Sequence, residues 1–253
     1  MAEGDTILRT ARRLEAALAG RRVAVAAPNP RGRAAGVDAL DGAMLRGARA
    51  LGKHLLLDFG ELTLHSHLGM SGSWHLYRRG AGWRRPRSSA WVVLDGGEHT
   101  AAQWGGPTLR VLRTAQLRRD PTLARLGPDV LAPAADPDAL SASLRAAGPE
   151  RELGEALLDQ SLIAGIGNVF KSEGCFAARL SPWRRLGELD DGELRGAIVA
   201  TRELMQRAVA DGRQPRAVYR RRGRPCPTCG RPIRSRGQGD ANRTTYWCPT
   251  CQP

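Results

Sequence analysis

The chain has 253 residues, 42% of them hydrophobic, which is enough for the cores of about two domains. Thirty-nine lysines and arginines against 25 aspartates and glutamates give a formal net charge of +14. Such a charge favours a polyanionic partner, usually nucleic acid, over an acidic membrane, since no basic amphipathic helix with a Trp, Phe and Leu face accompanies it. No apolar run approaches the roughly 18 residues of a membrane span, and the charged N-terminus is unlike a signal peptide, so we expect a cytoplasmic protein.

The basic residues are almost all arginines, and lysine occurs only at Lys53 and Lys171. Arginine is not deprotonated in proteins, whereas an amine exchanges protons and shifts its pKa readily. Each lysine therefore marks a position where arginine would not serve. Lys171 falls in a helical pattern, and we expect it to be a solvated helix residue rather than a catalytic one.

The N-terminal stretch MAEGDTILRT leads into apolar positions at helical spacing, which predict a helix over residues 6–20. Asp5 or Thr6 would cap its start, and Gly20 would end it. Glu3 lies outside this predicted helix, beside the amino terminus. In an arbitrary protein a solvated chain end would explain such a carboxylate.

From about residue 21 to 115 the pattern is that of short strands. Apolar or alternating runs cover residues 54–60, 62–70, 91–94 and 108–113. A turn signal, Asp95 followed by two glycines, closes the third run. Several short strands at close spacing predict a sandwich or a barrel.

A proline-rich stretch at residues 120–150, with one short helix near 139–147, predicts a domain boundary. Helices are predicted beyond it over residues 152–164, from Asn168 onward, and over 190–210 with Asp190 or Asp191 as cap.

The C-terminal segment contains two CxxC pairs separated by 18 residues: Cys226, Cys229, Cys248 and Cys251. Structural zinc takes four tetrahedral ligands, and this spacing is usual for a Cys₄ site. Two disulfides are the alternative, which a cytoplasmic location disfavours. The pattern predicts one structural Zn²⁺ per chain with no open position for catalysis. The remaining Cys175 is expected to be a buried apolar filler.

A two-glycine turn lies in the stretch IAGIGNVFKSE, residues 163–173. Glycines permit the close approach of another backbone, and the N–H groups at the start of the next helix form an anion site. Many helix–turn–helix corners use glycine for geometry alone. Beside the +14 charge, we expect a DNA phosphate at this site.

Several motifs, in this order along the chain, resemble the formamidopyrimidine-DNA glycosylase and endonuclease VIII family. They are the MxEGDT start, LGKHLLLDF (51–59), SHLGMSGSW (66–74), LGPDVL (126–131), the two-glycine turn, VYRRRGRPCPTCG (218–230) and the final ribbon RTTYWCPTCQ. The resemblance implies an α+β multidomain chain. An N-terminal β-sandwich with a leading helix would occupy residues 1–125, a helix–two-turn–helix domain 126–214, and a zinc finger 215–253.

The same resemblance implies a bifunctional base-excision-repair enzyme, a DNA glycosylase with AP lyase activity, acting as a monomer on damaged double-stranded DNA. The opening motif is similar to the endonuclease VIII branch. Only residues 211–225 separate the last predicted helix from the zinc finger, whereas the 8-oxoguanine branch typically carries a long loop there. We therefore expect oxidised pyrimidines as substrates.

The resemblance assigns catalytic roles to four residues. The family's nucleophile is the amine of residue 2, here Ala2, freed when Met1 is removed, and Glu3 would move protons on the sugar. Lys53 would hold the phosphate near the lesion and assist β-elimination; an edge-strand lysine is the alternative. Arg243 would clasp phosphate and take part in δ-elimination.

The resemblance also assigns DNA contacts. His67 and Tyr219 match phosphate contacts, although such residues are often merely structural, and Asn168 matches a backbone contact at the turn. Met70 matches the apolar wedge that fills the space left by a flipped base, with a strand-end core residue as the alternative. The family's other gap-filling residues have no clear match in residues 99–110.

One departure concerns position 2, where the family usually has proline and this chain has Ala2. A secondary amine gives an iminium that is charged without protonation, whereas a primary amine gives an imine that must hold a proton. An α-amine has a pKa near 7.7–8.0, against about 10.4 for lysine, so much more of it is neutral at cellular pH. Two alternatives remain: a catalytically weak or inactive lesion-binding protein of the same fold, and a generic zinc-ribbon protein that binds nucleic acid.

Overall fold

The computed structural model describes residues 2–253, and its contacts divide them into two compact units. Unit 1 comprises Ala2 and Thr6–Ala124, and unit 2 comprises Glu3–Asp5 and Arg125–Pro253. Three residues from the N-terminal segment therefore pack with a part of the chain that is more than a hundred residues away in sequence.

The first helix, α1, covers Gly4–Leu18 and buries Ile7, Leu14 and Leu18. It begins two residues before the predicted start, so Asp5 lies in its first turn and neither Asp5 nor Thr6 precedes the helix as a cap. The physical reason is a backbone partner, because the Gly4 N–H donates to the Gly165 carbonyl at 2.9 Å. Gly20 follows the helix with a φ of 77°, as expected of a glycine at a helix end.

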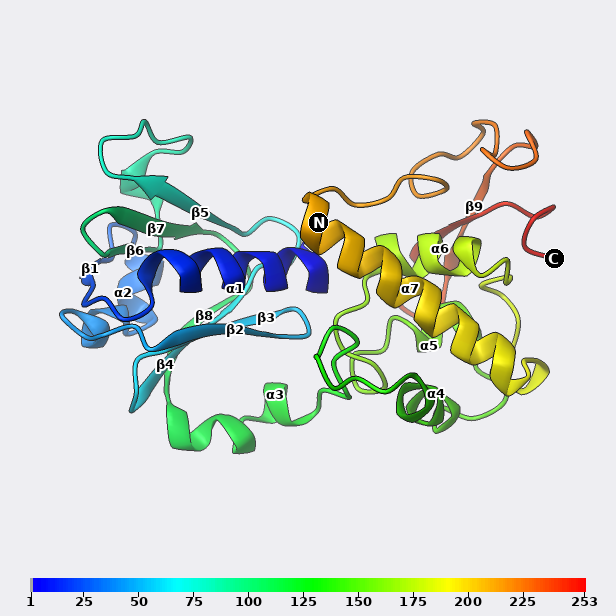
Figure 1. The fold of residues 1–253 in the computed structure, drawn as a ribbon, viewed down its shortest axis with the longest axis horizontal. Helices are drawn as coiled ribbons and strands as arrows, with labels where there is room; N and C mark the ends of the chain where they lie inside the picture. Colours follow the sequence, from blue (N-terminus) through cyan, green and yellow to red (C-terminus); the bar gives the residue numbers. More distant parts are fainter. Residues whose placement is uncertain (1) are drawn as a thin grey trace. The chain divides into compact units, whose positions relative to one another are not determined.

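Unit 1 contains two four-stranded antiparallel sheets, which Figure 1 shows in blue to green. The first has the order β1 (Ala24–Ala26), β6 (Val92–Asp95), β7 (His99–Trp104), β5 (Ser73–Arg78). The second has the order β2 (Gly47–Leu51), β3 (His54–Asp58), β4 (Leu62–His67), β8 (Thr108–Arg113). Leucines and valines of both sheets and of α1 form one core, so the predicted β-sandwich with a leading helix is confirmed.

The predicted strand at residues 108–113 coincides with β8, and β3 and β4 lie within the two earlier runs. Strands β1, β2, β5 and β7 were not predicted. They are short or carry polar and small residues, as in GARAL of β2, so their pattern is weak. Short helical segments connect the strands: α2 (Pro30–Ala34), η1 (Val37–Leu40), η2 (Arg87–Ser89), η3 (Thr114–Arg119) and α3 (Pro121–Ala124).

Unit 2 is helical up to residue 211. Its helices are α4 (Pro137–Arg145), α5 (Leu153–Ala156), α6 (Asn168–Ala177), η4 (Leu186–Glu188) and α7 (Asp191–Asp211). As predicted, α7 is capped by Asp190, whose carboxylate accepts the Glu193 N–H at 2.7 Å. The helix predicted over residues 152–164 is wrong, since α5 is a single turn. Asp159 instead accepts both the N–H and the hydroxyl of Ser161, which competes with helical hydrogen bonding.

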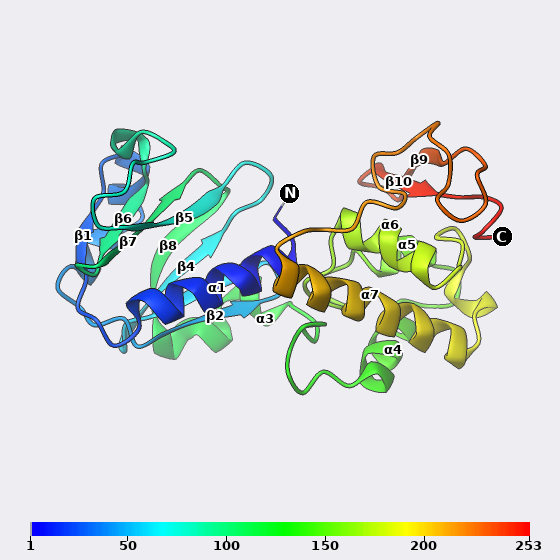
Figure 2. The ribbon, with the colours of Figure 1, turned by 45° about the horizontal axis from the view of Figure 1, so that its top comes forward.

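The end of unit 2 is a two-stranded hairpin, β9 (Arg234–Gln238) with β10 (Arg243–Trp247), which we call the zinc hairpin. Figure 2 shows both strands near α6, and β10 contacts α6 directly. Cys226, Cys248, Val218 and Ile233 form its small core. Over residues 2–253, no helix has the length and apolar character needed to cross a membrane.

Candidate active site

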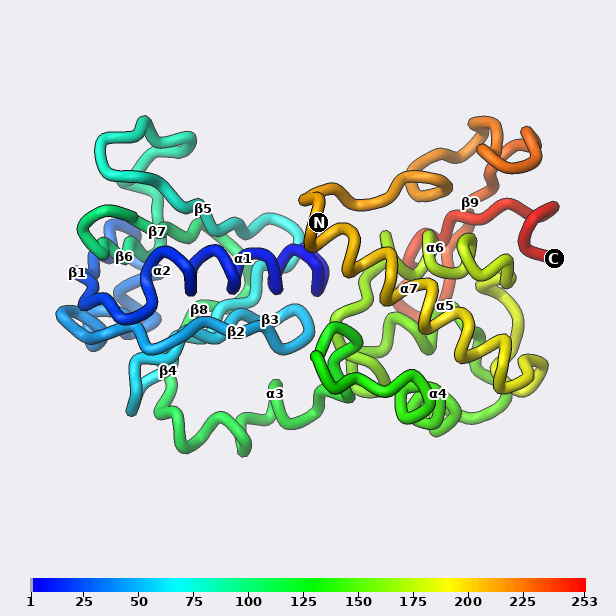
Figure 3. The backbone as a smooth tube through the Cα atoms, in the orientation of Figure 1, coloured from blue at the N-terminus to red at the C-terminus, as the bar shows by residue number. Residues whose placement is uncertain are grey.

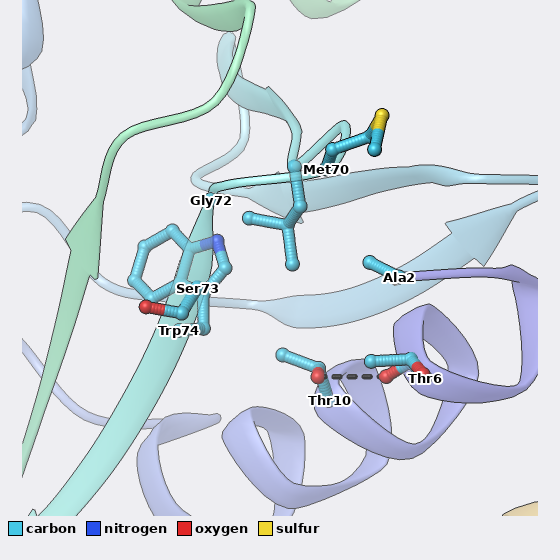
Figure 4. A pocket seen from close by; sticks show the side chains of 8 residues that line it. Ala2, Thr6, Thr10, Met70, Gly72, Ser73 and Trp74 are labelled. Atoms are coloured by element: carbon cyan, nitrogen blue, oxygen red, sulfur yellow. Dashed lines mark hydrogen bonds between the residues drawn. The ribbon is translucent and has the colours of Figure 1, made fainter. Parts of the chain in front are cut away.

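A pocket of about 220 Å³ in unit 1 contains the residue predicted to be the nucleophile. It is lined by Ala2, Thr6, Thr10, Leu68, Met70, Gly72, Ser73 and Trp74. Figure 4 shows these side chains, which come from the N-terminal segment, α1, the loop after β4 and the start of β5. Ala2 is half-buried, packs against the sandwich core and is one of the residues that line the pocket.

Met70 is 70% exposed, which excludes the alternative of a strand-end core residue. Strand β4 ends at His67, and the Gly72 N–H then bonds the Leu68 carbonyl at 2.8 Å, closing a tight turn. Gly69 adopts a φ of 56° in that turn, which favours glycine. Figure 4 shows the Met70 thioether directed away from Thr6 and Thr10. Met70 is therefore an exposed apolar side chain beside this pocket.

Lys53 lies in the two-residue turn between β2 and β3, after Gly52 with its φ of 56°. His67 is the last residue of β4 and is paired in register with His54 of β3. Burial lowers the pKa of His67, and the Lys53 charge lowers it further. The structure therefore places the catalytic lysine candidate and the phosphate-contact candidate at one end of the same sheet.

Behind this pair lies a hydrogen-bonded series that sequence reasoning missed, here called the histidine chain: His54, His65, Arg110 and Asp120. Arg110 Nε donates to His65 Nδ1 at 3.1 Å, and His65 Nε2 lies 2.8 Å from His54 Nδ1. Since arginine only donates, His65 accepts at Nδ1 and donates from Nε2 to His54. Arg110 is fixed in turn by the Asp120 carboxylate at 2.8 Å.

The two histidines of the histidine chain are neutral at cellular pH. Burial lowers the pKa of His54 to about 3 and the pKa of His65 to about 4, and the Arg110 charge contributes to both. The His54 ring lies 4.7 Å from the His67 ring, so the series ends against the phosphate-contact candidate. The only signal in the sequence was three histidines on adjacent strands, and their meeting depends on a register that the sequence does not reveal.

Glu3 is completely buried in unit 2, where its carboxylate accepts three backbone N–H groups at the start of α6. The donors are Gly167 at 3.1 Å, Val169 at 2.9 Å and Phe170 at 3.3 Å. The N–H groups of Gly167, Val169 and Phe170, at which we expected a DNA phosphate, therefore donate to a carboxylate of the chain itself. The anion is the chain's own Glu3, and the positive end of the helix dipole stabilises its charge.

The two-glycine turn leaves room for the N-terminal segment to pack closely against it. A Cβ atom on Gly167 would lie 2.2 Å from Glu3 Cδ, and one on Gly4 would lie 3.0 Å from Gly165 Cα. Gly165 itself has a φ of 105°, which side-chain-bearing residues rarely adopt. Close backbone approach was expected here, and the approaching backbone is that of residues 3–5.

Lys171 was expected to be solvated, and this is wrong, because its side chain is 0% exposed. Its Nζ donates to Thr245 Oγ1 at 2.5 Å and lies 3.5 Å from Gln238 Oε1. Burial lowers its pKa to about 8, and the nearby Arg243 charge contributes in the same direction. The lysine lies on α6 and both partners lie on the zinc hairpin, so one buried amine ties the hairpin to the helix that holds Glu3.

The remaining DNA-contact candidates differ in exposure. Arg243 opens β10 and is exposed, and among residues 2–253 no carboxylate lies within ion-pair distance of it. Asn168 is half-exposed, and its Nδ2 donates to the Thr244 carbonyl at 2.7 Å, which joins α6 to the hairpin a second time. Tyr219 is only 5% exposed and packs edge-on against Tyr246, so a structural role accounts for most of its ring.

The four cysteine sulfurs at the C-terminal end lie within 4.8 Å of one another. Two of the sulfur pairs, Cys226 with Cys251 and Cys229 with Cys248, are 3.8 and 3.5 Å apart. A tetrahedral zinc with Zn–S bonds of about 2.3 Å separates its sulfurs by about 3.8 Å, whereas a disulfide would join them at about 2 Å. The four residues therefore fit one structural Zn²⁺. Cys175 is buried apart from them, and burial raises the pKa of its thiol to about 12.

Comparison with known proteins accounts for almost the whole chain. The N-terminal domain of formamidopyrimidine-DNA glycosylase matches residues 1–119, its H2TH domain matches 126–218, and a zinc finger found in FPG and IleRS matches 223–253. A "Probable endonuclease 8 2" of Streptomyces coelicolor is 42% identical over 100% of this chain and 94% of its own length. The chain belongs to the formamidopyrimidine-DNA glycosylase and endonuclease VIII family.

Two further members of this family are informative. The "DNA-(apurinic or apyrimidinic site) lyase Nei2" of Mycolicibacterium smegmatis is 37% identical over 100% of this chain and 99% of its own length. The crystal structure of the MutM (Fpg) protein from Thermus thermophilus has a TM-score of 0.80 and 32% identity, covering 99% of this chain and 98% of that one. A Lactococcus lactis Fpg bound to AP-site DNA, at 23% identity and a TM-score of 0.82, shares the fold.

These matches confirm the predicted family, the multidomain α+β fold, the glycosylase and lyase class of enzyme and the Cys₄ zinc finger. They do not test the individual site residues. In the structure, Ala2 and Met70 share one pocket, Lys53 and His67 share one sheet end, and Glu3 and Asn168 share the start of α6.

Proposed function

We propose that this chain removes oxidised bases, pyrimidines in particular, from double-stranded DNA and then cleaves the strand through the amine of Ala2. The observation that carries the proposal is the pocket in which Ala2 lies beside exposed Met70, in a chain that matches DNA glycosylases along its whole length. A damaged base must leave the stack to be reached, and Met70 would fill the space it leaves.

The chemistry proposed for Ala2 starts with its neutral amine. The nitrogen attacks C1′ of the damaged nucleotide, the bond from C1′ to the base breaks, and opening of the sugar ring leaves a Schiff base. A proton is then lost from C2′, and the electron pair expels the 3′ phosphate; a second elimination expels the 5′ phosphate. Because the amine of Ala2 is primary, the Schiff base must be protonated to be as electrophilic as the iminium that proline forms.

Glu3 follows Ala2 directly, and we propose that it transfers protons to and from the sugar. Its three backbone hydrogen bonds hold the carboxylate in one orientation. Lys53 would hold the phosphate next to the lesion, with His67 beside it. Arg243, exposed on the zinc hairpin, would bind the phosphate that leaves in δ-elimination.

The four cysteines would hold the zinc, whose contribution is to fold the hairpin. Asn168 and Tyr219 would bind the DNA backbone from unit 2. We further propose that the chain acts as a monomer in the cytoplasm, associated with DNA through its positive charge. Three domains at residues 1–125, 126–214 and 215–253 remain our proposed division.

A strand-cleavage assay tests the proposal. Duplexes that carry an oxidised pyrimidine, an 8-oxoguanine or an AP site at one position are incubated with the protein, and the products are separated on a denaturing gel. Cleavage at the pyrimidine lesion and the AP site, with δ-elimination ends, supports the proposal. Cleavage of the 8-oxoguanine duplex alone would contradict the pyrimidine preference. Cleavage of none of the three duplexes would contradict the proposed glycosylase and lyase activity.

Ala2 itself favours a second candidate, a lesion-binding protein with little lyase activity. It predicts tight, selective binding to the lesion duplex with no strand cleavage even after complete removal of Met1. Replacement of Ala2 by proline would then create activity that the natural chain lacks.

A further inference from the structure

The loop between β5 and β6 is strongly positive and has no counter-charge. It contains five exposed arginines, and we call residues 78–87 the arginine loop: Arg78, Arg79, Arg84, Arg85 and Arg87. No aspartate or glutamate occurs anywhere in residues 62–94. Within the described part of the chain, none of the five guanidinium groups lies within ion-pair distance of a carboxylate. The backbone trace in Figure 3 follows this loop from β5 back to β6.

Aromatic rings hold the arginine loop in one conformation. Trp83 stacks on Tyr77 with ring centroids 4.6 Å apart, and the Arg87 guanidinium lies over Trp83 at 5.5 Å. The Trp104 indole N–H donates to the Pro86 carbonyl at 3.1 Å. The loop backbone is therefore pinned to β5 and β7 at several points, and the Arg85 and Arg87 guanidinium groups are held over tryptophan rings.

The arginine loop reaches the rim of the Ala2 pocket. Arg85 lies over the Trp104 ring at 5.4 Å, and its Nη1 donates to Ser73 Oγ at 3.1 Å. Ser73 is one of the residues that line the pocket with Ala2. A surface of fixed positive charge is therefore continuous, within unit 1, with the pocket where we place the reaction.

Five like charges within ten residues repel one another, and holding them together without an acidic partner costs free energy. The field is strong enough that Arg84 and Arg85, after burial, contribute to lowering the pKa of His75. Guanidinium groups held in place bind phosphate with little loss of side-chain entropy, and their planar fork fits two phosphate oxygens at once. A ligand that carries phosphates along its length would supply the counter-charge that the chain omits.

We propose that the arginine loop is a second phosphate-binding surface, which binds the DNA backbone of the duplex flanking the lesion. This inference rests on the proposed function for the location of the lesion at Ala2. It adds a DNA-binding region to those already proposed at Met70, at Asn168 and on the zinc hairpin. Shortening the duplex on the flank that lies on Arg84 and Arg87 should therefore weaken binding.

The test compares two variants of the full chain with the same loss of charge. Arg84→Gln with Arg87→Gln removes two charges from the arginine loop, and Arg31→Gln with Arg33→Gln removes two from α2. Both pairs are exposed side chains of unit 1, and Arg87 and Arg31 lie over tryptophan rings at 5.5 and 5.8 Å. Binding is measured on duplexes of about 12 and about 40 base pairs with a central AP-site analogue, at several salt concentrations.

On the long duplex, we expect the loop variant to bind about tenfold or more weakly than the wild type, with a salt slope lower by about 2. On the short duplex it should bind within about twofold of the α2 variant. Arg84→Lys with Arg87→Lys keeps the charge and should retain the salt slope of the wild type. Thermal unfolding of each variant shows whether the loop change has altered the fold.

Equal binding of the loop and α2 variants on every duplex would overturn the proposal. So would binding to phosphatidylserine vesicles that depends on Arg84 and Arg87 while DNA binding does not, because the surface would then belong to a membrane. Failure of the proposed function looks different: the wild type would neither prefer the AP-site duplex nor cleave it, whatever the loop variant does.

Discussion

The two units bury ionisable side chains in opposite ways. In unit 1, His54 and His65 are buried as neutral rings, and their hydrogen bonds run from Arg110 toward His67. In unit 2, Glu3 is buried as a carboxylate on backbone N–H groups. Lys171 is buried on polar partners from the zinc hairpin. Unit 1 therefore buries neutral rings that lead to the Arg110–Asp120 ion pair, whereas unit 2 buries charged groups that join its own segments.

This difference separates two tasks of a DNA-repair enzyme. In our proposal unit 1 presents groups to the DNA: exposed Met70, the turn at Lys53 and the arginine loop. In unit 2, α6 is bonded to three other segments. N–H groups at its start donate to Glu3, and Lys171 donates to the zinc hairpin. Glu173 accepts the N–H groups of residues 217–219. Variants in unit 2 should therefore alter folding and activity together, and variants on the surface of unit 1 mainly binding.

The largest effect is expected from the zinc hairpin. Cys248→Ser removes one of four thiolates, so the metal should be lost and DNA binding should fall by at least about 100-fold, because metal affinity is folding free energy in such sites. Metal analysis and gel shifts measure both, and Cys175→Ala is the control that should keep zinc. Normal binding by zinc-free protein would show that the hairpin does not need the metal.

The substitution Glu3→Gln should have the next largest effect. The amide cannot accept all three N–H groups, and it carries no charge for the start of α6, so we expect a loss of about 2–3 kcal/mol in the free energy of unfolding. Lyase activity should fall by at least about 100-fold. Urea unfolding and single-turnover cleavage measure the two effects, with exposed Glu61→Gln as the control. A stable variant with full activity would mean that Glu3 neither fixes the segment nor moves protons.

The buried amine of Lys171 should make the stability of the fold depend on pH in the alkaline range. Its pKa falls from 10.5 in the unfolded chain to about 8 in the fold. The unfolded state therefore binds more protons between these values, and stability rises with pH across that window. Relative to Lys171→Met, the wild type should gain about 2 kcal/mol between pH 8 and pH 10. A constant difference between the two proteins would show that the amine is not the buried, titrating group.

The histidine chain should cause a smaller change in stability, at acid pH. Both pKa values lie below 6.5 in the fold, so protons bind to the unfolded chain first and stability falls as the pH drops from 6.5 toward 4. His65→Gln removes one titrating group, and its stability should fall by about 1 kcal/mol less than that of the wild type between pH 6.5 and pH 5. Identical acid unfolding curves would contradict the buried neutral histidines.

Local signals predicted part of this structure and long-range packing decided the rest. The cysteine spacing, the Asp190 cap and the alternation of β8 each depend on nearby residues, and each appears as expected. The partner of Glu3 lies 164 residues away, at Gly167. No local pattern indicates that a helix-start anion site is filled from the other end of the chain.

The same limit explains the error at Lys171. A lysine in a helical pattern is normally solvated, and its burial depends on a hairpin that begins more than 60 residues later. The family motifs assign site residues that periodicity does not, because motif order preserves pairings between distant positions. These assignments stay predictions, the reactivity of the Ala2 amine among them.

Borohydride trapping shows whether the amine of Ala2 forms the covalent intermediate. The protein is incubated with an AP-site duplex and borohydride, and digestion with mass spectrometry then locates the adduct. We expect a DNA adduct on the N-terminal peptide at Ala2, absent when Met1 is retained and formed also by Ala2→Pro. A fully processed protein that gives no adduct, while Ala2→Pro gives a strong one, would contradict it.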